Sequence, residues 1–275
     1  MFCYLTARIK KMPKVKVNDI NIYYEIRGEG YPLVLISGFG ADHITWGKFA
    51  DKLALKYKII LFDNRGSGQT DCPDQEYSME QLAKDVKNLC DYLNIEKASF
   101  IGYSMGGFIV QQLAHDYSEL CENIIILNSA TKITKHYSLF MQAFYALLNN
   151  DTIAPEILAK LFLPWAYSDS FLSNELNVDK IIETIAKKPH PFTLIGFKNQ
   201  RSAVDNFDST GWIKTVRTPA LIVGSKKDII FYEKNIRNLF ELMPNSKYFK
   251  FKNVGHLPYI EEPDKLLQVV HEFIG

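Results

Sequence analysis

The chain has 275 residues, of which 47% are hydrophobic and 23% are charged, and its formal net charge is +1. This composition is ordinary for a globular protein with a large core, and the near-neutral charge gives no electrostatic reason to expect nucleic acid as a partner. No apolar run in the sequence approaches the roughly 18 residues that a membrane span needs, so we expect no membrane partner either.

The cysteines and the first residues of the sequence indicate the cellular compartment in which the protein is expected. The four cysteines, at positions 3, 72, 90 and 121, are scattered and form no C-x-x-C pair. Sparse cysteines suit a reducing compartment better than a disulfide framework, so we expect a cytoplasmic protein in which Cys90 and Cys121 are buried thiols. The first residues place a short apolar patch before three basic residues, the reverse of a signal peptide. We expect residues 1–12 to be an extension ahead of the core.

The first half of the chain alternates predicted strands with predicted helices. Apolar and polar residues alternate on either side of Asn18-Asp19, which predicts a hairpin at a sheet edge. Continuous apolar runs, typical of strands covered on both faces, then alternate with segments of helical spacing. The predicted strands are 33–36, 58–62, 97–101 and 123–127, and the predicted helices are 46–57, 78–93 and 108–114.

The second half of the chain begins by breaking this rhythm. Residues 131–208 are helical in pattern, rich in aromatic residues and leucine, and lack a long strand run. Strands are then predicted at 220–223 and 246–251, and a last helix at 263–274.

Strands that alternate with helices predict an α/β fold with a mostly parallel central sheet and helices on both faces. We expect a core domain of residues 13–130 and 209–275. Residues 131–208 would then be a helical cap, inserted before the strand 220–223 at the sheet edge where such folds place their sites.

The most informative motif is G-x-S-x-G at residues 102–106, with Ser104 at its centre. It follows a predicted strand and precedes a predicted helix, which is the context of a nucleophile elbow, a strained turn that holds a serine hydroxyl at the top of a sheet. Small residues are needed at 102 and 106 so that strand and helix can pack closely. Ser104 is therefore the candidate nucleophile.

A serine nucleophile needs a base and a group that orients the base, and after such an elbow they follow in the order acid, then histidine. Asp228 and His256 each follow one of the last two predicted strands, so both project onto the same sheet edge as Ser104. Asp205 and Asp208 are rivals for the acid but precede the strand. A surface aspartate and a buried structural histidine remain the alternatives for Asp228 and His256.

The negative charge that develops on oxygen during acyl transfer needs preorganised N–H donors. One should be the amide of Met105, which opens a helix where N–H groups are free and the dipole favours an anion. The second should be the amide of Phe39, in the turn after strand 33–36, with Gly40 as a lesser option. His43 lies near this turn, and both substrate contact and a helix-entry role stay open for it.

No motif points to a metal or a cofactor. The sequence lacks an H-E-x-x-H, a Walker A motif and clustered Cys/His spacings. The loop at 66–68 is too short for a dinucleotide fingerprint and is interpreted as a tight loop near the site. We therefore expect no metal and no cofactor.

These motifs together resemble the α/β-hydrolase superfamily, over nearly all of residues 13–275. The resemblance implies its fold and a triad of Ser104, Asp228 and His256. One departure is Ser37-Gly38, where family members often carry His-Gly; enol-lactonase-like members similarly lack that histidine. The segments that carry the resemblance are 37–40, 62–68, 102–107, 224–228 and 255–258.

Residue differences exclude several branches of the superfamily. Dehalogenase- and epoxide-hydrolase-like members use an aspartate nucleophile where this chain has Ser104. Prolyl-aminopeptidase-like members carry a His-Gly-Gly-Pro-Gly turn that is absent here, and carbon–carbon bond hydrolases usually have tryptophan where this chain has Leu257. The resemblance then implies hydrolysis of a carboxylic ester, lactone or thioester by two-step acyl transfer, in the serine esterase or enol-lactonase-like branch.

The predicted cap is rich in large apolar side chains. We expect most of them to form a small core of the cap and the rest to line an apolar pocket, which points to a small or medium acyl or alkyl group. The side chains expected to bind substrate are Tyr103, Phe140, Phe144, Trp165 and Leu257.

Our leading expectation is a carboxylesterase acting on a small-molecule ester, as a monomer or a homodimer. The alternatives are an enol-lactonase, a methyl-ester esterase acting on a substrate bound to acyl-carrier protein, as in biotin synthesis, and a receptor that binds a ligand with little turnover. The intact triad argues against the receptor. A carrier protein would need a basic cap surface, and the candidate residues, which are mixed with acids, are Lys160, Lys187, Lys188, Lys198 and Arg201.

Overall fold

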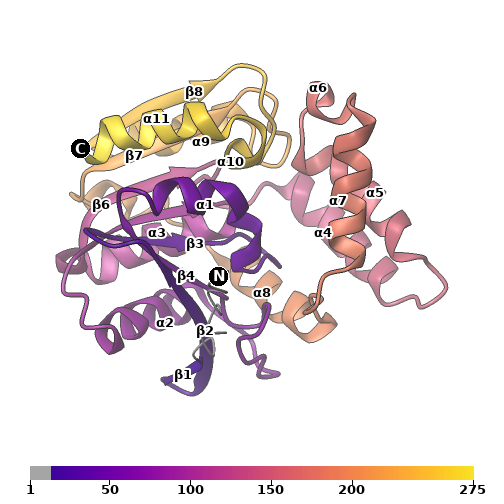
Figure 1. The fold of residues 1–275 in the computed structure, drawn as a ribbon, viewed down its shortest axis with the longest axis horizontal. Helices are drawn as coiled ribbons and strands as arrows, with labels where there is room; N and C mark the ends of the chain where they lie inside the picture. The colour runs from indigo at the N-terminus through magenta and orange to yellow at the C-terminus, as the bar shows by residue number, and fades with distance from the viewer. Residues whose placement is uncertain (1–13) are drawn as a thin grey trace, which may run out of the picture.

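The computed structural model describes residues 14–275, so the extension expected over residues 1–12 lies outside the described chain. The strands are β1 (Lys14–Val17), β2 (Ile20–Arg27), β3 (Pro32–Ile36), β4 (Lys58–Phe62), β5 (Ala98–Tyr103), β6 (Cys121–Leu127), β7 (Ala220–Ser225) and β8 (Ser246–Phe251). Within the described residues these eight form one sheet in the order β1-β2-β4-β3-β5-β6-β7-β8 (Figure 1). The hairpin β1–β2 lies at one edge, β2 runs antiparallel to β4, and the remaining pairs are parallel.

Helices cover both faces of this sheet. One face carries α2 (Met79–Tyr92), α3 (Met105–Asp116) and α9 (Glu233–Leu242), and the other carries α1 (Gly47–Leu53) and α11 (Pro263–Ile274). The buried strands supply both cores because successive side chains point to opposite faces. In β3, Val34 and Ile36 belong to one core, while Leu33 and Leu35 belong to the other. The predicted α/β fold, with a mostly parallel sheet between helices, is confirmed.

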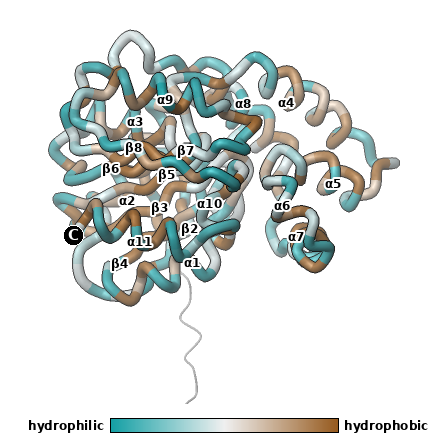
Figure 2. The backbone as a smooth tube through the Cα atoms, turned by 90° about the horizontal axis from the view of Figure 1, so that it is seen from above, coloured by the Kyte–Doolittle hydropathy of each residue, from teal (hydrophilic) through white to brown (hydrophobic). Residues whose placement is uncertain are grey.

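The chain between β6 and β7 is helical, and we call residues 135–206 the helical segment. It contains α4 (Lys135–Leu148), α5 (Pro155–Ala166), α6 (Asp169–Leu172), α7 (Glu175–Ala186) and α8 (Leu194–Asn206). Figures 1 and 2 show α5, α6 and α7 standing beside the sheet, whereas α8 lies closer to it. Tyr137 and Met141 of α4 and Phe197 of α8 belong to the same core as the sheet. A cap with boundaries at 131 and 208 remains a proposal.

One predicted helix is shorter than expected. Residues His43–Trp46 form a 3₁₀ turn, and α1 ends at Leu53 instead of reaching Tyr57. The chain makes turns over residues 54–57, whose amides bond back to carbonyls of residues 50–53, because it must reverse direction to enter β4. The other predicted elements are present, with ends shifted by a few residues.

The cysteines in the described chain are free. Cys90 and Cys121 are buried, as expected, and burial raises the pKa of the Cys90 thiol to about 12. Nowhere in residues 14–275 is a helix both long enough and apolar enough to cross a lipid bilayer.

Candidate active site

Ser104 occupies the sharp turn between β5 and α3. Its backbone has φ 55° and ψ −122°, a conformation that a residue with a side chain rarely adopts. Close packing requires the flanking glycines. A Cβ atom on Gly102 would lie 2.2 Å from the carbonyl oxygen of Gly106, and one on Gly106 would lie 2.1 Å from that of Ile36. The strained strand–turn–helix predicted around Ser104 is therefore present.

Asp228 and His256 lie together in the loops after β7 and β8. Asp228 Oδ2 is 2.8 Å from His256 Nδ1, and both side chains are buried. Asp228 Oδ1 accepts hydrogen bonds from the amides of Ile230 and Phe231, at 2.8 and 3.0 Å. Asp228 is thus not a surface residue, despite the lysines beside it. Because the carboxylate engages Nδ1, the imidazole keeps Nε2 for proton exchange with a neighbour.

Ser104 and His256 border the same large cleft, whose volume is about 950 Å³. In the described part of the chain, the serine hydroxyl makes no hydrogen bond to the imidazole. Bonds between a nucleophile and its base often tighten only in the complex with substrate. The structure therefore brings a buried Asp228–His256 pair and a strained Ser104 to one cleft, in the predicted chain order.

The rival acids do not contact the histidine. Asp205 accepts a hydrogen bond from Ser138 Oγ at 2.9 Å and pairs with Arg201 Nε at 3.1 Å. Asp208 pairs with Lys132 at the surface, at 2.8 Å. Of the candidate acids, only Asp228 is bonded to His256.

Two backbone amides remain as candidate oxyanion donors. Phe39 and Met105 both line a second, small cavity that also contains Ser104. Met105 is the first residue of α3, where the N–H has no acceptor within the helix. Gly40, the lesser option, is engaged, because its N–H donates to Gln200 Oε1 at 2.9 Å. The structure therefore favours Phe39 over Gly40.

Gln200 of α8 holds the loop that follows β3. Besides accepting from Gly40, it donates through Nε2 to the Arg65 carbonyl oxygen at 2.7 Å and to the Ser67 hydroxyl at 2.8 Å. Its side chain is fully buried. No sequence pattern points to Gln200, because its partners lie more than 130 positions earlier in the chain and form no motif with it.

Asn128, directly after β6, ties together the two loops that carry the acid and the histidine. Its Nδ2 lies 2.9 Å from Ser225 Oγ, 3.0 Å from the Gly255 carbonyl oxygen and 2.9 Å from that of His256. Its backbone has φ 43°, a left-handed conformation that asparagine tolerates better than most residues. No motif pointed to Asn128. Its only sequence signal is a polar residue at the end of a buried strand.

The helical segment contacts the histidine loop directly. The backbone amide of His256 donates to the carbonyl oxygen of Ala166, the last residue of α5, at 3.0 Å. Glu261 Oε1 accepts from the amides of Gly255 and Ser168, at 3.0 and 3.1 Å. Burial raises the pKa of the Glu261 carboxyl. The position of His256 is therefore coupled to the end of α5.

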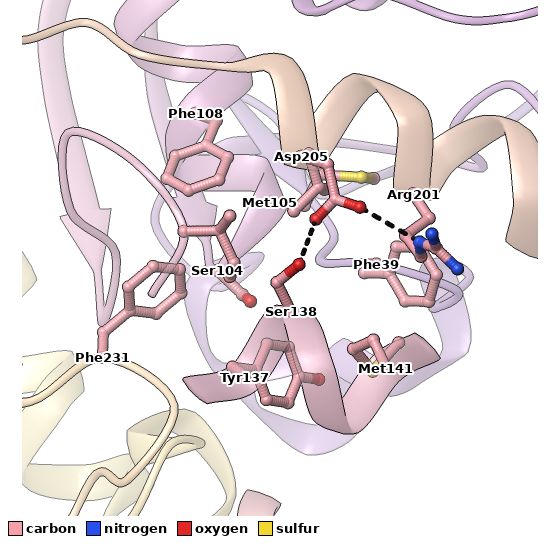
Figure 3. A pocket seen from close by; sticks show the side chains of 12 residues that line it. Phe39, Ser104, Met105, Phe108, Tyr137, Ser138, Met141, Arg201, Asp205 and Phe231 are labelled. Atoms are coloured by element: carbon pink, nitrogen blue, oxygen red, sulfur yellow. Dashed lines mark hydrogen bonds and ion pairs between the residues drawn. The ribbon is translucent and has the colours of Figure 1, made fainter. Parts of the chain in front are cut away.

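Two cavities of very different size meet at Ser104. The large cleft is bordered by His256, by α1 and by side chains of α5 and α7. The small cavity has a volume of about 20 Å³ and lies between Ser104, α4 and α8 (Figure 3). Ser104, Phe39 and Tyr137 border both, whereas His256 borders the large cleft and not the small cavity.

The side chains expected to bind substrate divide into two groups. Tyr103 and Leu257 border the large cleft. Phe140, Phe144 and Trp165 border neither of the two cavities at Ser104, and their role in substrate binding stays a prediction. Their rings pack α4 against α5, with the centroids of Phe140 and Trp165 only 4.2 Å apart. The aromatic side chains that border the cavities from the helical segment are Tyr137, Phe162, Tyr167 and Phe171.

Other polar motif residues have structural roles. His43 is buried between Asp63, whose Oδ1 lies 2.7 Å from Nδ1, and Glu25, whose Oε1 lies 3.0 Å from Nε2. Arg65 is buried and pairs with Asp85 at 2.8 Å. Neither His43 nor Arg65 borders a cavity at Ser104. Among residues 14–275, no three His, Cys, Asp or Glu side chains are grouped so as to hold a metal ion.

Comparison with known proteins agrees with this architecture. Residues 31–263 match the model of the alpha/beta hydrolase fold family. The 3-oxoadipate enol-lactonase 1 of Acinetobacter baylyi is 28% identical, over 90% of this chain and 90% of that protein. The pimeloyl-[acyl-carrier protein] methyl ester esterase of Legionella pneumophila is 27% identical, over 93% of this chain and 100% of that protein. The solved enol-lactonase of Burkholderia xenovorans has a TM-score of 0.84 at 24% identity, covering 95% of this chain and 99% of its own, which supports the fold alone.

Proposed function

We propose, from the premise that this chain belongs to the alpha/beta hydrolase family, that it is a serine hydrolase which cleaves carboxylic esters through an acyl-enzyme. The observation that carries the proposal is the convergence of three chain segments on one cleft. Ser104 is held on a strained turn, and His256, which is bonded to the buried Asp228, borders the same cleft. The relatives named as an enol-lactonase and an ester esterase support hydrolysis at a carboxylic carbonyl.

In the proposed mechanism, the Ser104 hydroxyl attacks the ester carbonyl while His256 Nε2 takes its proton. The amides of Phe39 and Met105 stabilise the oxyanion, each contributing roughly 3–4 kcal/mol by analogy with donor deletions in other hydrolases. His256 returns the proton to the departing alcohol, and water then releases the acyl group by the same steps. Asp228 holds the imidazole in the tautomer with the proton on Nδ1.

The test is hydrolysis of short-chain p-nitrophenyl esters by wild type and by Ser104→Ala. The substitution should lower kcat by roughly 10⁴-fold or more, as loss of a serine nucleophile does elsewhere. In the wild type, mass spectrometry after rapid quenching should find the acyl group on Ser104. Ser129→Ala is the matched control, because its buried hydroxyl has no hydrogen-bond partner among residues 14–275 and the residue borders neither cavity. Equal rates in wild type and Ser104→Ala would reject the mechanism, and rates no higher than the uncatalysed background in both would favour the ligand-binding receptor.

A carrier-bound methyl ester is the second candidate substrate, supported by the name of the Legionella relative. The basic side chains that would meet an acidic carrier are largely paired with acids. Lys187 pairs with Glu183, Lys188 with Asp42, Lys198 with Asp74 and Arg201 with Asp205. This pairing weakens the case for a carrier. Comparing free and carrier-bound methyl esters tests it, and a lactone in the same panel tests the enol-lactonase alternative.

We also propose that the protein acts in the cytoplasm. Cys72, Cys90 and Cys121 are free thiols in the structure, which suits a reducing compartment such as the cytoplasm. Localisation of a tagged chain by cell fractionation would test this.

A further inference from the structure

We infer that the enzyme acts on esters that join a very short acyl group, about the size of acetyl, to a much bulkier alcohol. The inference rests on the proposed serine mechanism and names the substrate class of that site. It comes from the different sizes of the two cavities at Ser104 and from the position of His256.

The position of His256 identifies the side of the leaving alcohol. When the tetrahedral intermediate collapses, the bond between the carbonyl carbon and the alcohol oxygen breaks, and that oxygen takes the proton that His256 accepted from Ser104. The alcohol must therefore leave within hydrogen-bond reach of the imidazole. Since His256 borders the large cleft, this cleft receives the alcohol.

The acyl chain must then extend in the remaining direction. The carbonyl carbon is bonded to Ser104 Oγ, its oxygen lies toward the amides of Phe39 and Met105, and its alcohol oxygen lies toward His256. The small cavity contains Ser104, Phe39 and Met105 but not His256, so it is the space left for the acyl substituent. A volume of about 20 Å³ accommodates a single water-sized group, because one such group needs roughly 10–15 Å³.

Packing on all sides keeps the small cavity small. Phe108 and Phe231 approach Ser104 from the core, and Met141 closes the cavity from α4 (Figure 3). At its far end Asp205 bonds both Ser138 and Arg201. The charges of Asp205 and Arg201 offset each other there, and the apolar walls leave room for a methyl group.

The large cleft has the opposite character. Phe162, Tyr167, Phe171 and Ile181 line it with apolar surface from the helical segment, and Leu257 lines it from the histidine loop. A cleft of about 950 Å³ holds a drug-sized organic molecule. A methyl ester of a long acyl chain has its bulk on the acyl side and so needs the reverse arrangement of the two cavities. The inferred substrate class therefore also argues against the carrier-bound methyl ester.

Two isomeric esters test the inference. 2-Phenylethyl acetate has the short group on the acyl side, and ethyl phenylacetate has the same atoms with the bulk on the acyl side. We expect kcat/KM for the first to exceed that for the second by roughly 100-fold, the discrimination that steric exclusion from a closed pocket can reach. In p-nitrophenyl esters, kcat/KM should fall steadily from acetate through butyrate to octanoate.

Two alanine substitutions, one in the wall of each cavity, enlarge the cavities separately and serve as matched variants. Met141→Ala should raise kcat/KM for butyrate relative to acetate by about 10-fold, whereas Ile181→Ala, which widens only the large cleft, should leave that ratio unchanged. Val204→Ala, a smaller change in the same cavity wall, replaces Met141→Ala if that variant does not fold. Circular dichroism checks each fold.

The outcomes separate this inference from the proposed function. Hydrolysis that depends on Ser104 but prefers octanoate, or prefers ethyl phenylacetate, overturns the inference and leaves the serine mechanism in place. Turnover that survives Ser104→Ala overturns the proposed function, and the inference with it.

Discussion

At the scale of single residues, Asn128 shows how a site depends on side chains outside any motif. Its amide group bonds to the last residue of β7, three positions before Asp228, and to the loop of His256 at the same time, and so links β6 to both. Ser104, in contrast, lies at the centre of a motif. Its strained φ of 55° is required by the same close packing that excludes a Cβ at positions 102 and 106, so its position was predictable from the motif.

We predict that Asn128→Gly lowers kcat by roughly 100-fold, the penalty for misplacing a catalytic group by about 1 Å, with little change in KM. Glycine removes the amide donor while accepting the positive φ, so backbone strain is not the cause of the loss. Asn128→Asp keeps the shape but replaces the donor by an oxygen that faces carbonyl oxygens, and we expect the same loss. Steady-state kinetics on a p-nitrophenyl ester measures both. Activity within twofold of wild type in either variant would show that Asn128 does not position His256.

At the scale of elements, apolar runs predicted the strands well because strands buried on both faces have a simple pattern. Leu33–Ile36 and Ala220–Val223 are examples. The pattern could not say which faces of α4 and α5 meet each other and which meet the cleft, since both are apolar. Phe140 and Trp165 therefore looked like substrate contacts, although they pack on one another. The role of Gln200 could not be predicted for a related reason. A glutamine in a helical pattern does not indicate that its side chain bonds to backbone groups far away in the sequence.

We predict that Gln200→Leu lowers the free energy of unfolding by about 3 kcal/mol, because the partly buried amide of Gly40 and the buried carbonyl of Arg65 lose their partner and each such loss costs roughly 1–3 kcal/mol. Urea denaturation followed by circular dichroism measures the change. Gln112→Leu is the matched control and should cost much less, since within the described residues the side chain of Gln112 donates only to Asp116 of its own helix. An equal loss in both variants would contradict the role of Gln200 in holding the loop after β3.

At the scale of the whole molecule, the rule that parallel strands present their carboxyl ends at one edge predicted the convergence of three distant segments. The sizes of the cavities were beyond prediction, because they depend on how α4 and α8 pack against the core. The buried cluster of Glu25, His43 and Asp63 was also beyond prediction. It joins β2, the 3₁₀ turn and the end of β4, and it should affect global stability.

The pH dependence of stability tests this cluster. Burial lowers the pKa of His43, but the hydrogen bond and charge of Asp63, with the charge of Glu25, outweigh burial, so the pKa is raised. A raised pKa in the folded state gives stability that is fully present below the unfolded value of about 6.5 and is lost as the pH rises through the folded value. Urea denaturation should therefore show the wild type losing stability as the pH rises above about 6.5. His43→Gln should show less of this dependence, and parallel curves for the two proteins would refute the assignment.

The hydrogen bond between the backbone amide of His256 and the carbonyl oxygen of Ala166 couples the histidine loop to the end of α5. In the proposed function, a bulky ester enters the large cleft beside α5. The last carbonyl oxygen of α5, that of Ala166, accepts the hydrogen bond from His256. A displacement of α5 away from the cleft would break this hydrogen bond and release the backbone of His256. Closure of α5 and alignment of the catalytic base would then occur together, because one hydrogen bond links them.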